Sequence, residues 1–160
     1  EDPKEQKINK PYPPLGIRYL SAWLELQGYD IEGFDTTFST FAAHRDYLIR
    51  TQPDIIAIYT NLMTKLDVIR LIRMIRAEEA LKESLVVLGG PDLRYNVENY
   101  LATGADVLII GEGEQSMMAL EQAVEQGLRP HFGHIQGLAF VDSDGHITQT
   151  PALKHLRAVD

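Results

Sequence analysis

The sequence predicts an α/β domain, with a doubly wound parallel sheet covered by helices and a β-hairpin at its C-terminal end. Three observations predict this fold class. Short apolar runs alternate with longer amphipathic stretches, which is the order of parallel strands joined by helical crossovers. The runs are almost continuously apolar, as expected where helices cover both faces of a strand. Near residue 137 the pattern changes to two short runs around a polar turn.

The elements follow from these patterns in chain order. The predicted strands are residues 30–34, 55–59, 85–88 and 107–110. The predicted helices are residues 15–27, 41–50, 65–82, 97–103 and 115–126. The hairpin pairs residues 137–141 with 147–150 around Asp142-Ser143-Asp144-Gly145. That turn has a faint likeness to a calcium loop, but a third oxygen ligand and the closing Glu are missing, so the hairpin is preferred.

Composition limits the function. The chain has 160 residues, 44% hydrophobic and 24% charged, which suits one globular domain, and its net charge of −8 argues against nucleic-acid binding. Its longest apolar runs are too short for a membrane span, so the default expectation is a cytoplasmic domain. It has no cysteine, which excludes an iron–sulfur cluster held by these residues. Arg70, Arg73 and Arg76 have helical spacing and are expected on a solvated helix face.

One expected element is missing. A first strand should precede the helix at residues 15–27, yet residues 1–10 are polar and contain one aliphatic residue, Ile8. In the flavodoxin-like (Rossmann-like) order 2-1-3-4-5, that strand would lie between residues 30–34 and 55–59. We expect a strand from further upstream, a strand exchanged with a neighbouring chain, or a sheet closed up in an altered order.

Ligands of such sheets bind beyond the carboxyl ends of the strands. Three strands are followed there by residues 60–64, 89–91 and 111–114, and residues 12–16 precede the first helix. Glycines let a ligand approach the backbone, and small polar side chains can bond its amides. There is no Gly-x-Gly-x-x-Gly or Gly-Lys-Ser/Thr loop, and two glutamates in the last segment would repel phosphate. A large, mostly neutral cofactor with an amide rim suits this edge.

The order and spacing of several short segments carry a family resemblance. The segments are Tyr12-Pro13-Pro14-Leu15-Gly16, Tyr19-Leu20, Gly28-Tyr29, Asp35, Pro53-Asp54-Ile55-Ile56-Ala57, Leu88-Gly89-Gly90-Pro91, Gly104-Ala105-Asp106 and Gly111-Glu112-Gly113-Glu114. Together they resemble the cobalamin (vitamin B12)-binding domains of radical-SAM proteins over residues 11–150. That family includes cobalamin-dependent methyltransferases and the anaerobic magnesium-protoporphyrin monomethyl ester cyclase.

The resemblance implies a cobalamin-binding domain at residues 11–135, a hairpin at 136–150 and the start of a linker at 151–160. A radical-SAM domain of the same polypeptide would follow, holding S-adenosylmethionine and a [4Fe-4S] cluster, so this chain itself would catalyse nothing. The implied cofactor contacts are Thr60, Asn61, Leu62, Met63 and Thr64 on the buried side, Gly89, Gly90 and Pro91 at the nucleotide tail, Tyr12, Pro13, Pro14, Leu15 and Gly16 at the lower corrin face, and Glu112, Gly113 and Glu114 at the rim.

The resemblance also bears on the cobalt ligand. Other cobalamin domains carry Asp-x-His-x-x-Gly, whose His ligates cobalt; placing Gly16 on that Gly puts Pro13 at the His position. His44 lies in another element and is expected on a helix surface. We therefore expect no protein imidazole on cobalt, and no metal at His131-x-x-His134, which stands in a predicted loop.

Two alternatives remain open from the sequence. One is a flavodoxin-like domain that binds FMN or a nucleotide, with phosphate contacts at Thr36, Thr37, Ser39 and Thr40. The other is an interaction module of the same fold without a cofactor. In that case its own side chains would close the edge at Gly89 and Gly90.

Overall fold

The computed structural model of the chain describes residues 15–34, 39–128 and 131–153. It consists of two compact units, Glu1–His44 and Arg45–Asp160. The first contains α1 (Leu15–Leu26) and the start of α2 (Phe41–Thr51). Within the described ranges, none of the helices combines the length and the apolar character that crossing a membrane requires.

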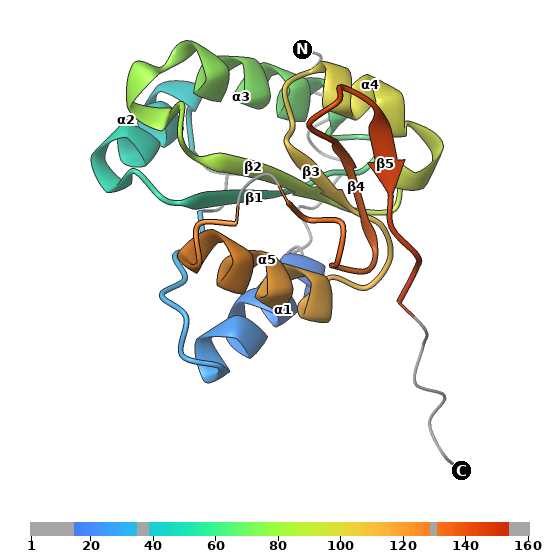
Figure 1. The fold of residues 1–160 in the computed structure, drawn as a ribbon. Coiled ribbons are helices and arrows are strands. Elements are labelled where there is room, and N and C mark those ends of the chain that lie inside the picture. Colours follow the sequence, from blue (N-terminus) through green and yellow to red (C-terminus); the bar gives the residue numbers. More distant parts are fainter. Residues whose placement is uncertain (1–14, 35–38, 129–130, 154–160) are drawn as a thin grey trace. The chain divides into compact units, whose positions relative to one another are not determined.

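The second unit is built on one five-stranded sheet (Figure 1). Its strands are β1 (Ile55–Tyr59), β2 (Leu85–Gly89), β3 (Val107–Ile109), β4 (Leu138–Val141) and β5 (Ile147–Gln149). They lie side by side in chain order. The first three are parallel, whereas β4 and β5 add to β3 as an antiparallel hairpin. The predicted α/β fold class, flavodoxin-like with a C-terminal hairpin, is confirmed.

Helices cover both faces of this sheet. α3 (Lys65–Ala77) and α4 (Val97–Ala102) lie on one face, and α5 (Glu114–Glu125) lies on the other (Figure 1). Short 3-10 helices, η3 (Glu79–Leu81) and η4 (Leu93–Tyr95), follow α3 and β2. The helix predicted over residues 65–82 is therefore two pieces, because Glu78 adopts an extended backbone between them.

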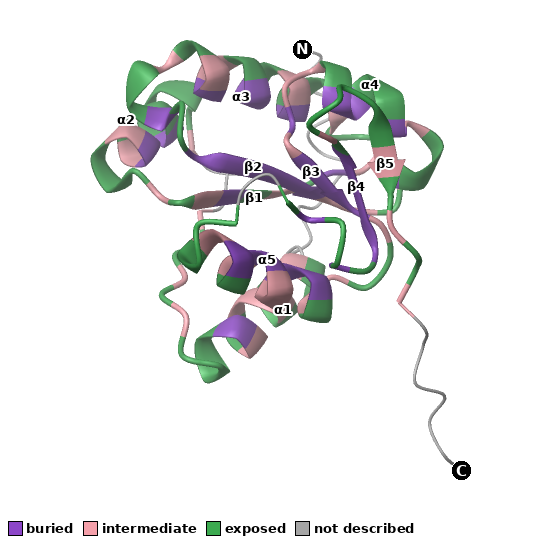
Figure 2. Cartoon of the chain, in the orientation of Figure 1, coloured by how far each residue is buried: buried purple, intermediate pink, exposed green. Residues whose placement is uncertain are grey.

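The core explains why the strands are continuously apolar. In β2, Val86 and Leu88 belong to one buried cluster with Ile72 and Ile75 of α3. Val87 alternates with them along the strand, so it points to the opposite face, where α5 lies, and it is buried as well. Figure 2 shows this burial through the central strands β2, β3 and β4. In a strand that is buried on both faces, every side chain packs against apolar neighbours, and therefore every position is apolar.

The predicted strand at residues 30–34 is wrong: this segment has no strand structure. A β-strand needs a neighbour for its backbone hydrogen bonds, and in the predicted order its neighbour would have been the first strand. Among the described residues no strand pairs with residues 30–34, and β1 pairs with β2 alone. Residues 1–10, where the first strand was sought, lie outside the described residues.

His44 also departs from expectation. Its ring is stacked on the ring of Phe34, with centroids 4.3 Å apart and planes 4° from parallel, and only 8% of the residue is exposed. Burial lowers the pKa of the His44 imidazole, because the charged form loses hydration. His44 is thus a packed residue of the N-terminal unit and not an exposed helix residue.

Candidate functional site: the carboxyl edge of the parallel strands

The segments that follow β1, β2 and β3 lie along one edge of the sheet. The strands are parallel and adjacent, and their last residues are in register: Tyr59 pairs with Gly89, and Gly89 pairs with Ile109. The chain therefore leaves all three strands at the same level. This brings together residues 60–64, 89–91 and 111–114, which the sequence placed at a common edge.

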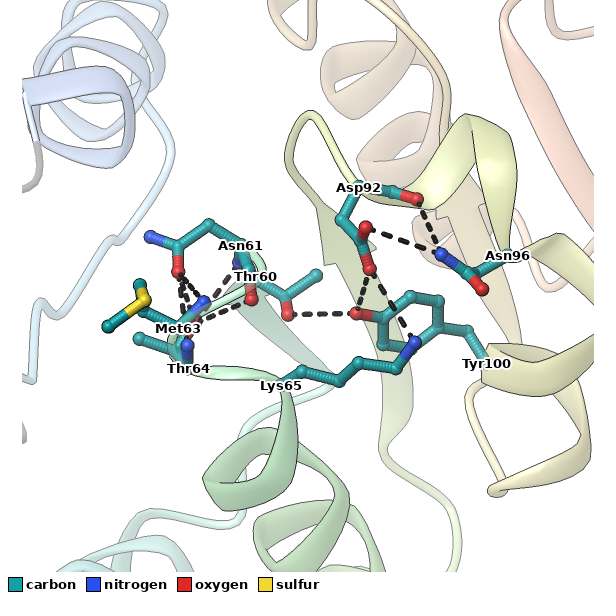
Figure 3. A network of polar contacts seen from close by, with 8 residues as sticks. All are labelled: Thr60, Asn61, Met63, Thr64, Lys65, Asp92, Asn96 and Tyr100. Carbon is teal, nitrogen blue, oxygen red and sulfur yellow. Dashed lines mark hydrogen bonds and ion pairs between the residues drawn. The ribbon is translucent and has the colours of Figure 1, made fainter.

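Asn61 shapes the segment after β1. Its side-chain Oδ1 accepts hydrogen bonds from the backbone N–H groups of Met63, at 2.9 Å, and Thr64, at 3.0 Å. The Asn61 N–H donates to Thr64 Oγ1 at 3.1 Å (Figure 3). This local turn leaves Leu62 74% exposed and Met63 81% exposed. The result is a hydrogen-bonded loop that presents two apolar side chains to the solvent.

Thr60 points the other way. It is 0% exposed, its N–H donates to the Gly89 carbonyl at 2.8 Å, and its hydroxyl lies 3.4 Å from the Tyr100 hydroxyl. The Thr60 side chain is therefore turned into the domain (Figure 3). A direct contact between Thr60 and a cofactor does not fit this conformation. Thr60 instead supports the loop from the interior of the domain.

Gly89 and Gly90 have different roles. A Cβ atom added to Gly90, whose φ is +138°, would lie 1.8 Å from the backbone oxygen of Thr60. Gly90 is therefore required by the protein itself, where the ends of β1 and β2 approach each other. A Cβ atom on Gly89 would meet no atom within 4 Å. The open approach to the backbone that the sequence predicted for both glycines thus exists at Gly89.

A polar network that the sequence did not reveal lies behind these two loops. The Tyr100 hydroxyl donates to Asp92 Oδ2 at 2.8 Å, and Asn96 Nδ2 donates to Asp92 Oδ1 at 3.3 Å. Lys65 Nζ lies 3.8 Å from Asp92 Oδ2 and 5.2 Å from the centre of the Tyr100 ring. Burial is the main cause that raises the pKa of Tyr100, and Asp92 adds to it. Local periodicity marks Tyr100 only as a core position of a helix.

The segment after β3 is held by the hairpin. The Ile110 N–H donates to the Gly137 carbonyl at 2.8 Å, and Gly111 turns the chain with a φ of +108°. Gly113 precedes α5, which begins at Glu114. Glu112 is exposed and Glu114 is half-buried. This end of the edge is therefore polar and acidic, in contrast to the apolar pair at Leu62 and Met63.

Other residues predicted for the site belong to the N-terminal unit or lie outside the described residues. Leu15 and Gly16 form the first turn of α1 in the N-terminal unit, whereas Tyr12, Pro13 and Pro14 lie outside the described residues. Thr40 was one of the phosphate contacts predicted for the alternative nucleotide-binding domain, and the structure uses it differently. Its hydroxyl accepts from the Ala43 N–H and so caps α2.

Two further features lie away from this edge. Asp142, Asp144 and His146 lie close together, but the Asp142 carboxylate already accepts from the N–H groups of Asp144 and His146 and from the Thr148 hydroxyl. This is the predicted hairpin turn. An open pocket of about 260 Å³, lined in part by Leu85 and Phe140, lies at the amino ends of β2 and β3, opposite the three loops.

Comparisons with known proteins agree with this arrangement. The chain is 27% identical over 155 residues to the anaerobic magnesium-protoporphyrin IX monomethyl ester cyclase of Rubrivivax gelatinosus. The match covers 93% of this chain and 28% of the cyclase. Among solved structures, the cobalamin-dependent S-adenosylmethionine radical enzyme OxsB with aqua-cobalamin and S-adenosylmethionine bound matches with a TM-score of 0.82 at 20% identity, over 93% of this chain and 21% of that one. The radical S-adenosylmethionine methyltransferase TsrM of Kitasatospora setae, with cobalamin and a [4Fe-4S] cluster bound, matches with a TM-score of 0.69 at 20% identity, over 93% and 28%.

The chain therefore spans about a quarter of the length of these relatives. The solved structures share its fold. The model of the B12 binding domain matches residues 6–121, which is most of the chain, and the chain belongs to the family of B12-binding domains.

Proposed function

We propose that this chain binds cobalamin along the carboxyl edge of β1, β2 and β3. The observation that carries the proposal is the open backbone at Gly89, with the hydrogen-bonded loop of Leu62 and Met63 beside it and a polar segment on the other side. A corrin ring is broad and apolar on its faces, and its rim carries amides. Leu62 and Met63 suit such a face, whereas the Asn61 amide and the carboxylates of Glu112 and Glu114 suit its rim.

The proposed contacts follow the predicted set with two changes. Asn61, Leu62, Met63 and Thr64 meet the cofactor from the β1 side, Gly89 and Pro91 admit its nucleotide tail, and Glu112, Gly113 and Glu114 line the rim. Thr60 and Gly90 support this surface from inside. Leu15 and Gly16, together with Tyr12, Pro13 and Pro14, remain the proposed contacts of the lower corrin face.

We further propose that the protein gives cobalt no imidazole ligand. The segments 60–64, 89–91 and 111–114 contain neither His nor Cys. The His44 ring is stacked on Phe34 and buried, and its lowered pKa reflects packing. Bound cobalamin would supply the chemistry of its cobalt, and the protein would hold and orient the ring.

The reaction would belong to a longer polypeptide. The relatives that match this chain are several times its length, and their names include radical-SAM enzymes. We propose that a radical-SAM domain of the same polypeptide, with S-adenosylmethionine and a [4Fe-4S] cluster, acts on the upper face of the cofactor. Methyl transfer and oxidative cyclisation are the two reaction types that the relatives suggest.

Titration with hydroxocobalamin tests the proposal directly. We expect saturable binding, with a visible spectrum that lacks the signature of histidine ligation, and with lower affinity than in a polypeptide containing the radical-SAM domain. FMN titrated in parallel should not bind. Absence of cobalamin binding at millimolar concentration, or tighter binding of FMN, would contradict the proposed function. A histidine-ligated spectrum would contradict the part that concerns the cobalt ligand.

A second proposal concerns the outer edge of β1. Among the described residues this edge has no paired strand, and the unpaired backbone groups of an open strand edge invite pairing. We propose that a strand adds there, either from further upstream in the same polypeptide or exchanged with a neighbouring chain. Sedimentation of the 160-residue chain tests the exchange, which gives a dimer and which a monomer would contradict. An upstream strand is tested by a lengthened polypeptide, whose melting temperature should rise above that of the 160-residue chain and whose self-association should fall.

A further inference from the structure

The loops after β1 and β2 are joined through two side chains, the buried Tyr100 and the partly exposed Asp92. Tyr100 comes from α4 and is 1% exposed. Asp92 comes from the segment that follows Gly89, Gly90 and Pro91. Tyr100 donates its only hydroxyl proton to Asp92, so the Thr60 hydroxyl must be the donor in its longer contact with Tyr100.

The network extends to the start of α3. Lys65 Nζ approaches both the Asp92 carboxylate and the face of the Tyr100 ring, and its side chain runs across that ring (Figure 3). Lys65 directly follows the turn that Asn61 closes on Thr64. One carboxylate thus ties the end of the first loop to the second.

The backbone contacts make the two loops a unit. The Thr60 N–H donates to the Gly89 carbonyl, and Gly90 lies directly against the Thr60 carbonyl. The surface that carries Leu62 and Met63 and the opening at Gly89 are therefore set by the same internal contacts. A surface whose parts are fixed before binding loses less conformational entropy when a ligand arrives.

We infer that Tyr100, held by Asp92, is a positioning residue that keeps these two loops in the one conformation that accepts the cofactor. The inference rests on the proposed function for the identity of the ligand. Tyr100 does not touch the cofactor, because its side chain is buried behind the loops. It acts on binding through Asp92 and Lys65.

Tyr100→Phe tests this role by removing only the hydroxyl. We expect the dissociation constant for hydroxocobalamin to rise about tenfold. In the unliganded chain, amide hydrogen exchange should speed up about tenfold at residues 61–64 and 92–93 and stay unchanged in β4 and β5, because only the two loops lose the Tyr100 hydrogen bond. Tyr95→Phe is the matched control: Tyr95 is an exposed tyrosine in η4, and neither measurement should change.

Asp92→Asn is the second variant, because it weakens the same tie while the Tyr100 ring stays packed. A loop-restricted change in exchange in either variant, with weaker binding, supports the positioning role. Exchange that increases throughout the domain in both variants would reveal a merely structural role and would overturn the inference, as would Tyr100→Phe behaving like the original protein. If the original protein bound no hydroxocobalamin, the proposed function would fail, and the unliganded exchange experiment would still decide whether Tyr100 holds the loops.

Discussion

Replacing Gly90 by alanine should lower the free energy of unfolding by about 3 kcal/mol or more. The added Cβ would lie 1.8 Å from the Thr60 carbonyl oxygen, and the backbone φ of +138° is one that alanine rarely adopts. Backbone atoms cannot swing away as a flexible side chain can. The ends of β1 and β2 would therefore have to separate, and the Thr60 N–H would lose its bond to Gly89. Urea denaturation of the purified variant measures the effect.

Gly89→Ala is the matched control in the neighbouring residue. No atom lies within 4 Å of its added Cβ, so the free energy of unfolding should stay within about 1 kcal/mol of the original. Binding of hydroxocobalamin should weaken at least about tenfold, equivalent to about 1.4 kcal/mol, because the methyl group occupies the proposed approach of the cofactor. Equal stability of Gly90→Ala and Gly89→Ala would show that the strand ends are not in close contact. Unchanged binding by Gly89→Ala would remove Gly89 from the site.

Arg76→Ala is expected to have the second large effect on stability, about 2 kcal/mol. The Arg76 guanidinium donates to the Gly104 carbonyl at 2.7 Å and to the Ser84 carbonyl at 3.3 Å, and it forms an ion pair with Asp106. Asp106 in turn accepts from the Val86 N–H at 2.7 Å. These contacts join α3 to the amino ends of β2 and β3, and the partial exposure of both charges limits their contribution.

Arg73→Ala provides the comparison on the same helix. Arg73 is exposed, so its loss should change the free energy of unfolding by no more than about 0.5 kcal/mol. Because Arg76 lies at the opposite edge from the loops that follow β1, β2 and β3, Arg76→Ala should leave hydroxocobalamin affinity unchanged in the folded fraction. Equal effects of the two substitutions, measured by urea denaturation, would contradict the structural role of Arg76. The sequence predicted Arg76 on a solvated face, and for this residue the prediction is wrong.

Much of the fold was predictable because buried positions of strands and helices carry apolar side chains, and the spacing of these side chains is visible in the sequence. β1 has the predicted bounds, residues 55–59, and the other sheet strands differ by one residue at an end. The helices that flank them were found for the same reason, since one apolar stripe must face the sheet. The segment at residues 30–34 carried a similar pattern and formed no strand, because a strand also depends on a neighbour that lies far away in the sequence.

The position of the candidate edge was predictable from the sequence, but the roles of its individual residues were less so. Parallel strands end at one edge, so residues 60–64, 89–91 and 111–114 had to meet once the strands were known. The sequence could not separate Gly89 from Gly90, and it could not tell that Thr60 turns inward. Those differences arise from the approach of one strand end to its neighbour.

The sequence by itself thus determined the fold class, the edge at which residues 60–64, 89–91 and 111–114 meet, and the resemblance to B12-binding domains, since these depend on local periodicity and on short ordered motifs. The tertiary structure alone decided which residues of that edge are open and which support it. Thr60 meets Tyr100 only when α4 packs on the sheet, and Arg76 meets Asp106 only when α3 lies over the sheet. A hydrogen bond between residues far apart in the chain leaves no periodic trace, because its geometry exists only after the core has assembled.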